Sequence, residues 1–104
     1  MFKLSTDNTR VAYIAAQEVP GTWEVFEVDL AQPGVTTKIS GPMTYGGAYW
    51  FDYAEDDTHI VYMAAQDSEF AELFDVTLAQ PGVSTRLNST LVSGGEVWDF
   101  LIAP

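Results

Sequence analysis

Two groups of residues combine side chains that could bind a ligand. Each joins aromatic rings to carboxylates, with Tyr49, Trp50 and Asp52 in the first group and Glu96, Trp98 and Asp99 in the second. Aromatic faces and carboxylates together can hold a cation, a sugar or a basic peptide. Carboxylate oxygens are also the ligands that Ca²⁺ prefers, so Asp52 or Asp99 could serve a calcium site instead. In the competing interpretation the tryptophans only pack in a core, where large aromatic rings dominate the energetics.

No residues have the spacing of a catalytic site. His59 is the only histidine, and Arg10 replaces it in a matching segment, so His59 is expected at the surface rather than as a base or a metal ligand. The serines lack nucleophile-elbow spacing, and no glycine-rich phosphate loop, His-x-x-x-His or Asp-x-Asp-x-Asp-Gly pattern occurs. We therefore predict a protein that is not an enzyme and that needs no metal and no cofactor.

An internal repeat must position these residues. The hexapeptide Leu-Ala-Gln-Pro-Gly-Val begins at Leu30 and again at Leu78, 48 residues later, and the segment 10–17 recurs at 59–66. Phe2, Phe51 and Phe100 open three related segments, the last of which the chain does not complete. The predicted organisation is a first repeat at 1–50, a second at 51–99 and the start of a third at 100–104.

Each repeat contains four short β-rich runs separated by turns, and no run has the period of an amphipathic helix. Strands are expected at 48–54, 59–65, 72–78 and 84–87, with counterparts at 10–16, 24–30, 36–39 and 96–103. The runs 11–16 and 60–65 are apolar or small at every position, so both faces of these strands should be buried. Four-stranded antiparallel units of this length, each covered on both faces, are typical of the blades of a β-propeller.

The motifs also resemble a known family. The pattern Phe-x-x-Ala-x-Asp-Asp-x-x-Ile-Val-Tyr at 51–62 and the pattern Glu-Leu-Phe-x-Val-x-Leu at 72–78 are similar to the TolB-type, WD-like propeller repeat. The turns at 5–8 and 54–57 replace the Pro and Gly of the usual Ser-Pro-Asp-Gly turn, and Ala103-Pro104 would open the next one. The resemblance implies docking platforms, ligand-binding domains or accessory domains of hydrolases, which are often periplasmic or exported.

Members of that family usually carry six or seven blades, whereas two blades cannot close a ring. Head-to-tail contacts between identical chains close a ring when the rotation per chain divides the circle. We expect a homotrimer with six blades, and a homotetramer with eight is the alternative.

The last strand is expected to join the chains as a latch, by adding to the first blade of a neighbour. The residues of this interface are Val97, Phe100, Leu101 and Ile102 from one chain and Val11 and Tyr13 from the next. In the alternative, Met1–Ser5 pairs with the strand at 10–16 in its own chain and the C-terminal segment remains free.

Charge limits the partners. Fifteen acidic residues against four basic ones give a net charge of −11, which argues against nucleic acid and anionic membranes. The chain has no cysteine and no signal-peptide pattern, so its compartment is left open. The predicted function is a non-catalytic propeller segment that assembles with itself and binds a protein or small ligand. The alternative is a fragment of a longer propeller that serves an exported ligand binder or a hydrolase.

Overall fold

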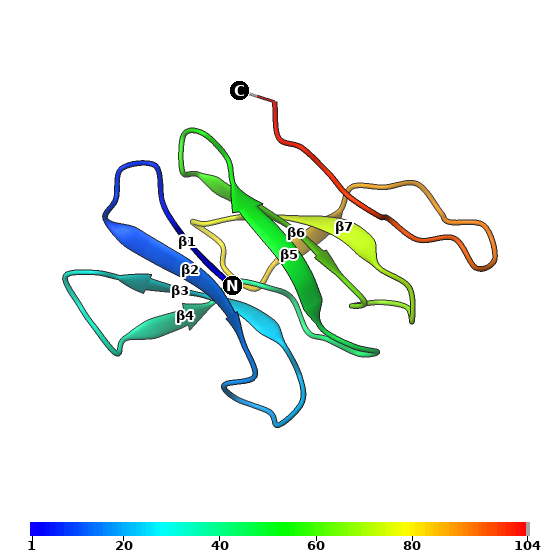
Figure 1. The fold of residues 1–104 in the computed structure, drawn as a ribbon, viewed down its shortest axis with the longest axis horizontal. Helices are drawn as coiled ribbons and strands as arrows, with labels where there is room; N and C mark the ends of the chain where they lie inside the picture. The colour runs from blue at the N-terminus through cyan, green and yellow to red at the C-terminus, as the bar shows by residue number, and fades with distance from the viewer. Residues whose placement is uncertain (104) are drawn as a thin grey trace.

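The computed structural model describes residues 1–103, which form two antiparallel sheets and no helix (Figure 1). The first sheet contains β1 (Phe2–Leu4), β2 (Arg10–Ala15), β3 (Glu24–Asp29) and β4 (Thr36–Lys38). The second contains β5 (Ala48–Tyr53), β6 (His59–Ala64), β7 (Glu72–Thr77) and β8 (Ser84–Arg86). In both sheets the strands lie in sequence order. The predicted all-β chain with two four-stranded antiparallel units is confirmed, and the described residues include no helix able to span a membrane.

The C-terminal tail (residues 87–103) is where the predicted strands fail. Seven of the eight predicted strands end within one residue of the observed bounds, but residues 96–103 form no strand. A strand needs a free sheet edge, and the edge of β2 that this segment was expected to use is occupied by β1 of the same chain. Local pairing of the N-terminus therefore describes the single chain. Pro104, with the turn that it was expected to open, lies outside the described residues.

The second sheet buries one face completely. The register places Phe51 opposite Tyr62 and Tyr62 opposite Phe74, so these three rings lie in a row on one face. Tyr62 and Phe74 stack with their ring centroids 5.4 Å apart. All three rings are at most 1% exposed and belong to a single hydrophobic cluster.

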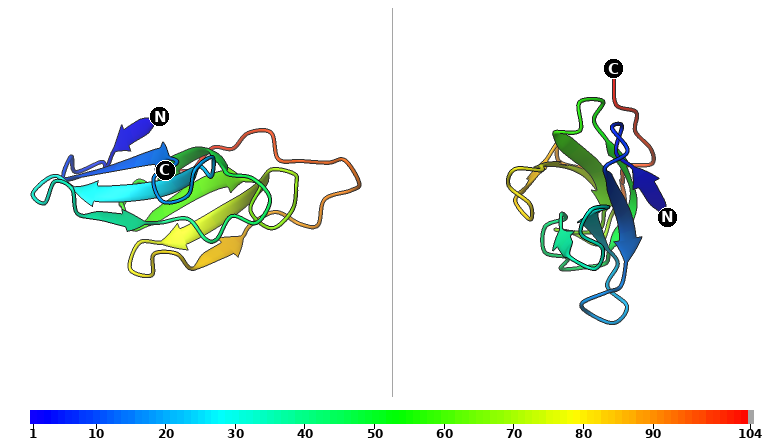
Figure 2. Two further views of the ribbon diagram at one scale, coloured as in Figure 1. Left: turned by 90° about the horizontal axis from the view of Figure 1, so that it is seen from below. Right: turned by 90° about the vertical axis from the view of Figure 1, so that its left-hand side faces the viewer.

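That cluster joins the two sheets, which lie as neighbouring layers (Figure 2). From the first sheet it includes Ala12 and Val25, both fully buried. The small side chain of Ala12 lets the aromatic face of the second sheet approach closely. We call this contact the junction. It leaves uncovered the outer face of the first sheet, with Val11 and Tyr13, and the open face of the second, with Val61 and Met63.

The chain crosses between the sheets by a path that the repeat uses twice. A Cβ on Gly47 would lie 2.7 Å from the carbonyl oxygen of Trp23, so this close approach requires glycine. The next residue, Ala48, donates its amide to Trp23 O at 2.8 Å. Val97 donates in the same way to Ala71 O at 2.8 Å. The chain therefore leaves the second sheet into the tail along the same route by which it leaves the first sheet into β5.

Candidate functional site

The first predicted ligand group already holds a cation from its own chain. The Lys3 ammonium lies 4.6 Å from the centroid of the Trp50 ring and 3.3 Å from Asp52 Oδ1. Both contacts are partly exposed, so they contribute modestly to stability. The chemistry expected of aromatic and acidic groups is present, but its partner is Lys3, which the sequence reasoning did not consider.

The second group does not converge on one site either. Tyr49, Glu96 and Trp98 line an open hollow of about 270 Å³ together with Met63, Ala71 and Val97. Asp99 instead accepts the amide of Phe100 at 2.8 Å. Among residues 1–103 no group of His, Cys, Asp and Glu side chains is placed to hold a metal ion. The six predicted residues are thus divided among three settings.

The junction carries the most specific polar contacts in the molecule. The Asp57 carboxylate in the β5–β6 turn accepts the amide of Thr6 at 2.8 Å, its hydroxyl at 2.7 Å and the amide of Asp7 at 3.1 Å. Burial disfavours the charge of Asp57, but the hydrogen bonds from Thr6 and Asp7 outweigh it and lower the pKa of this carboxyl. We call this arrangement the clasp. It fixes the β1–β2 turn against the β5–β6 turn.

Charged groups surround the clasp. Arg10 donates from Nη2 to the Asp57 carbonyl oxygen at 3.1 Å, and its Nη1 lies 3.4 Å from Glu27 Oε2. Tyr53 donates its hydroxyl to Glu27 Oε2 at 2.8 Å. Burial and the Glu27 carboxylate raise the pKa of Tyr53, so this hydroxyl remains a donor at neutral pH. The Ser5 and Thr9 hydroxyls bond Asp7 and lower its pKa to about 2.

A buried tyrosine receives the chain that crosses the junction. The hydroxyl of Tyr62 accepts the Gly41 amide at 3.0 Å and donates to Gln66 Oε1. Gln66 in turn donates to Ser84 Oγ at 2.8 Å. Burial raises the pKa of Tyr62. This network holds the segment after β4 against the second sheet.

The same network recurs on the outer face of the first sheet, without a partner across it among residues 1–103. Tyr13 donates to Gln17 Oε1 at 2.6 Å, and Gln17 donates to Thr36 Oγ1 at 3.0 Å. Both hydrogen bonds are exposed. The outer face therefore displays the side chains with which the second sheet binds its neighbour.

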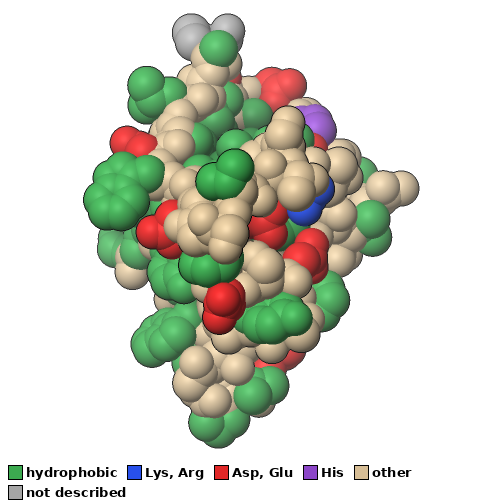
Figure 3. Space-filling model, turned by 90° about the vertical axis from the view of Figure 1, so that its right-hand side faces the viewer, with side chains coloured by type: hydrophobic (Ala, Val, Ile, Leu, Met, Phe, Trp, Pro, Cys, Tyr) green, Lys and Arg blue, Asp and Glu red, His purple; other side chains and the backbone are tan. Residues whose placement is uncertain are grey.

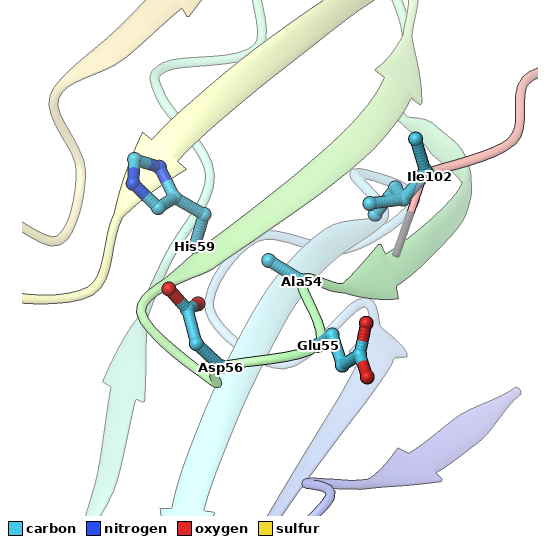
Figure 4. Close-up of a pocket in the computed structure, with 6 residues that line it drawn as sticks. Ala54, Glu55, Asp56, His59 and Ile102 are labelled. Atoms are coloured by element: carbon cyan, nitrogen blue, oxygen red, sulfur yellow. The ribbon is translucent and has the colours of Figure 1, made fainter.

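The open face of the second sheet contains the largest hollow described here, about 490 Å³. Its walls are Ala54, Glu55, Asp56 and His59 from the β5–β6 region and Ile102 and Ala103 from the tail. Ile102 stands across from His59 in Figure 4. His59 Nδ1 lies 3.0 Å from Asp75 Oδ1, in the place that the Arg10–Glu27 pair takes in the first sheet. The Thr58 hydroxyl and amide lower the pKa of Asp56.

Hydrophobic side chains are exposed along the tail. Figure 3 views the molecule from the side of the tail, where hydrophobic and acidic groups are interspersed. Trp98 is 84% exposed and Leu101 is 96% exposed. These two side chains therefore have almost no contact with the rest of the chain.

Comparisons with known proteins add no assignment. No protein-family model, curated protein or solved structure matches this chain. The TolB-type resemblance therefore remains a prediction from the sequence motifs. The function has to be argued from the junction and from the two uncovered faces.

Proposed function

We propose that the chain is a non-catalytic building block that assembles head to tail through its uncovered faces, as the blades of a propeller do. One observation carries this proposal: each half of the junction recurs on the opposite surface of the molecule. The outer face of the first sheet has the arrangement of side chains that the second sheet brings to the junction. The open face of the second sheet has the arrangement that the first sheet brings to the junction.

The aromatic side chains show the copying most directly. Tyr13 and Phe26 stack on the outer face with centroids 5.7 Å apart and planes 24° apart. Their counterparts at the junction, Tyr62 and Phe74, are 5.4 Å and 23° apart. Phe2 takes the position of the buried Phe51 but is 70% exposed. Phe26 is already buried in the single chain, so a second copy would cover Phe2 and the exposed part of Tyr13, with a gain of roughly 25 cal/mol per Å² of apolar area.

The sizes of the side chains also fit this pairing. On the open face Val61 and Leu73 replace the smaller Ala12 and Val25 of the junction. On the outer face the changes run the other way, since Val11 replaces Ile60 and Leu4 replaces Tyr53. The larger side-chain volume on the open face offsets the smaller side-chain volume on the outer face, which keeps the packed volume close to that of the junction.

Repeating such a contact creates a ring. Three chains would supply six blades and four chains eight, both within the range of about four to eight blades in known propellers. The closed ring would act as a binding or scaffold module. The trimer is our expectation.

Solution mass tests this proposal. Light scattering coupled to size exclusion is expected to give three times the chain mass of 11.4 kDa. The assembled particles should dissociate on dilution. A fourfold mass would support the tetramer. A folded monomer at every concentration would refute head-to-tail assembly.

We propose further that the tail acts as a latch by exchanging with β1 of the next chain. Phe100, Leu101 and Ile102 would take the places of Phe2, Lys3 and Leu4 beside β2. β1 pairs with β2 over only three residues, whereas β5 spans six. A tail with the length of β5 would therefore add main-chain hydrogen bonds that β1 cannot make.

Paired cysteines distinguish the two partners of β2. Val11 lies opposite Leu4 in the observed register, and Ile102 is the counterpart of Leu4 in the exchanged strand. We expect the variant V11C/I102C to form disulfides between chains on mild oxidation, seen as a ladder or a covalent trimer on non-reducing gels. The matched variant V11C/L4C should form its disulfide within one chain if β1 stays in place. Monomeric V11C/I102C beside efficiently closed V11C/L4C would rule out the latch.

A further inference from the structure

We propose that the hollow beside Glu55 and Asp56 is the receptor for Asn8 of a second copy. The inference rests on the proposed head-to-tail assembly and assigns the contact that sets its specificity. The occupant is the β1–β2 turn of the next chain, which would insert as the β5–β6 turn inserts at the junction.

The clasp supplies the template. In the first sheet, the amides of Thr6 and Asp7 point to the Asp57 carboxylate. Glu55 and Asp56 are their counterparts in the second sheet, and their amides donate to no backbone carbonyl within residues 1–103 outside the strand pairing. These residues line the hollow (Figure 4). The counterparts of the two amides that bind Asp57 thus belong to residues that line a hollow.

Asn8 has the backbone shape that this role requires. It adopts φ 60° in the β1–β2 turn, and Asp57 adopts φ 61° at the equivalent position of the β5–β6 turn. Both side chains therefore project from a left-handed residue. Such a conformation is uncommon outside glycine and is enriched in Asn and Asp. Asn8 therefore presents its amide group as Asp57 presents its carboxylate.

The donor and acceptor side chains change together between the clasp and the proposed contact at the hollow. At the clasp, the Thr6 hydroxyl donates to the Asp57 carboxylate. At the hollow, Glu55 replaces Thr6, so the receptor offers a carboxylate instead of a hydroxyl donor. An amide side chain satisfies both needs, because its oxygen accepts from the backbone amides and its NH₂ group donates to Glu55. A carboxylate in the same place would face Glu55 and Asp56 with no side-chain donor opposite it.

His59 can complete the contact. Arg10 donates from Nη2 to the carbonyl oxygen of Asp57 at the clasp, and His59 is its counterpart. Nδ1 lies 3.0 Å from Asp75 Oδ1. In the protonated imidazole both ring nitrogens are donors, so Nδ1 can donate to Asp75 and the other nitrogen to the carbonyl oxygen of Asn8. The receptor thus keeps two backbone amides and a side-chain donor for the carbonyl oxygen, while the Glu55 carboxylate replaces the Thr6 hydroxyl.

The substitution Asn8→Asp tests the contact. Asp57 shows that the equivalent turn of the second repeat accommodates aspartate in this conformation, so the fold of the single chain should be retained. We expect the dissociation constant for self-association to rise at least tenfold in sedimentation velocity. The double variant N8D/E55T recreates the Thr6–Asp57 pair between chains, and we expect it to restore association to within about threefold of the wild type.

Two comparisons make the test decisive. Val19→Asp adds the same charge at an exposed position in the β2–β3 loop and should leave association unchanged. Association of N8D equal to that of the wild type would overturn the inference, as would failure of E55T to rescue N8D. If the wild type itself does not associate, the proposed assembly fails as well, and the two failures are thereby told apart.

Discussion

Replacing Phe51 with alanine is expected to lower the free energy of unfolding by about 3 to 5 kcal/mol, whereas the same change at Phe2 should cost no more than about 0.5 kcal/mol. The two residues occupy the same position of the repeat, but Phe51 is fully buried at the junction and Phe2 is 70% exposed. The pair isolates the effect of burial, since residue type and strand position are held constant.

Urea unfolding followed by tryptophan fluorescence at low protein concentration would measure both changes. The loss at Phe51 is a large fraction of the 5 to 15 kcal/mol typical of a small domain, so F51A should be largely unfolded well below the wild-type midpoint. Equal and small losses at both positions would mean that the sheets do not pack through this ring. Phe2→Ala should show its effect instead on self-association, where the neighbouring chain would cover the ring.

The strands could be predicted from the sequence because their signals are local. The β-rich runs and turn residues predicted seven of the strand positions to within one residue, and the turns expected at 5–8 and 54–57 contain the left-handed residues Asn8 and Asp57. The sheet order follows from strands joined by short turns. The tail matches β5 in sequence but forms no strand in the single chain, because pairing depends on which sheet edge is free.

The site could not be predicted in the same way. Asp57 contacts Thr6 across 51 residues, and a local pattern carries no information on a contact of that separation. The aromatic and acidic candidates were grouped by type, and Lys3 was overlooked although it bonds Asp52. One signal could have revealed the junction: the exchange of Thr6 and Asp57 for Glu55 and Asn8 at corresponding positions. Its meaning becomes clear only in the folded chain, where the β1–β2 turn contacts the β5–β6 turn.

The uncovered faces explain why the copies differ as they do. Selection for a stable single chain alone would favour polar groups at Val61, Met63 and Leu73, which face away from the junction. Instead these positions are apolar, and His59 replaces Arg10 at the rim. An apolar centre with a polar rim is the usual anatomy of a protein interface.

Substituting lysine for Val61 is expected to abolish self-association while leaving the single chain folded. In the observed register Val61 lies between Asp52 and Asp75, so a lysine ammonium there would find favourable cross-strand charges in the free chain. Within an assembled ring the same side chain would occupy the position that Ala12 has at the junction, where the exposed fraction is zero. Removing the ammonium from water costs several kcal/mol even beside opposite charges, and 2.7 kcal/mol already corresponds to a hundredfold change in affinity.

The matched variant is Ala12→Lys, which places the same side chain inside the junction of the chain itself. It should unfold the protein, because the fully buried position has no space for the longer side chain. Glu27, which lies opposite Ala12 in the register, already pairs with Arg10 and Tyr53. Circular dichroism would report folding and sedimentation velocity would report association for both variants. If V61K associated as tightly as the wild type, the open face would lie outside the subunit contact. A folded A12K would show that the junction itself tolerates a charge, and the analogy between the two contacts would lose its basis.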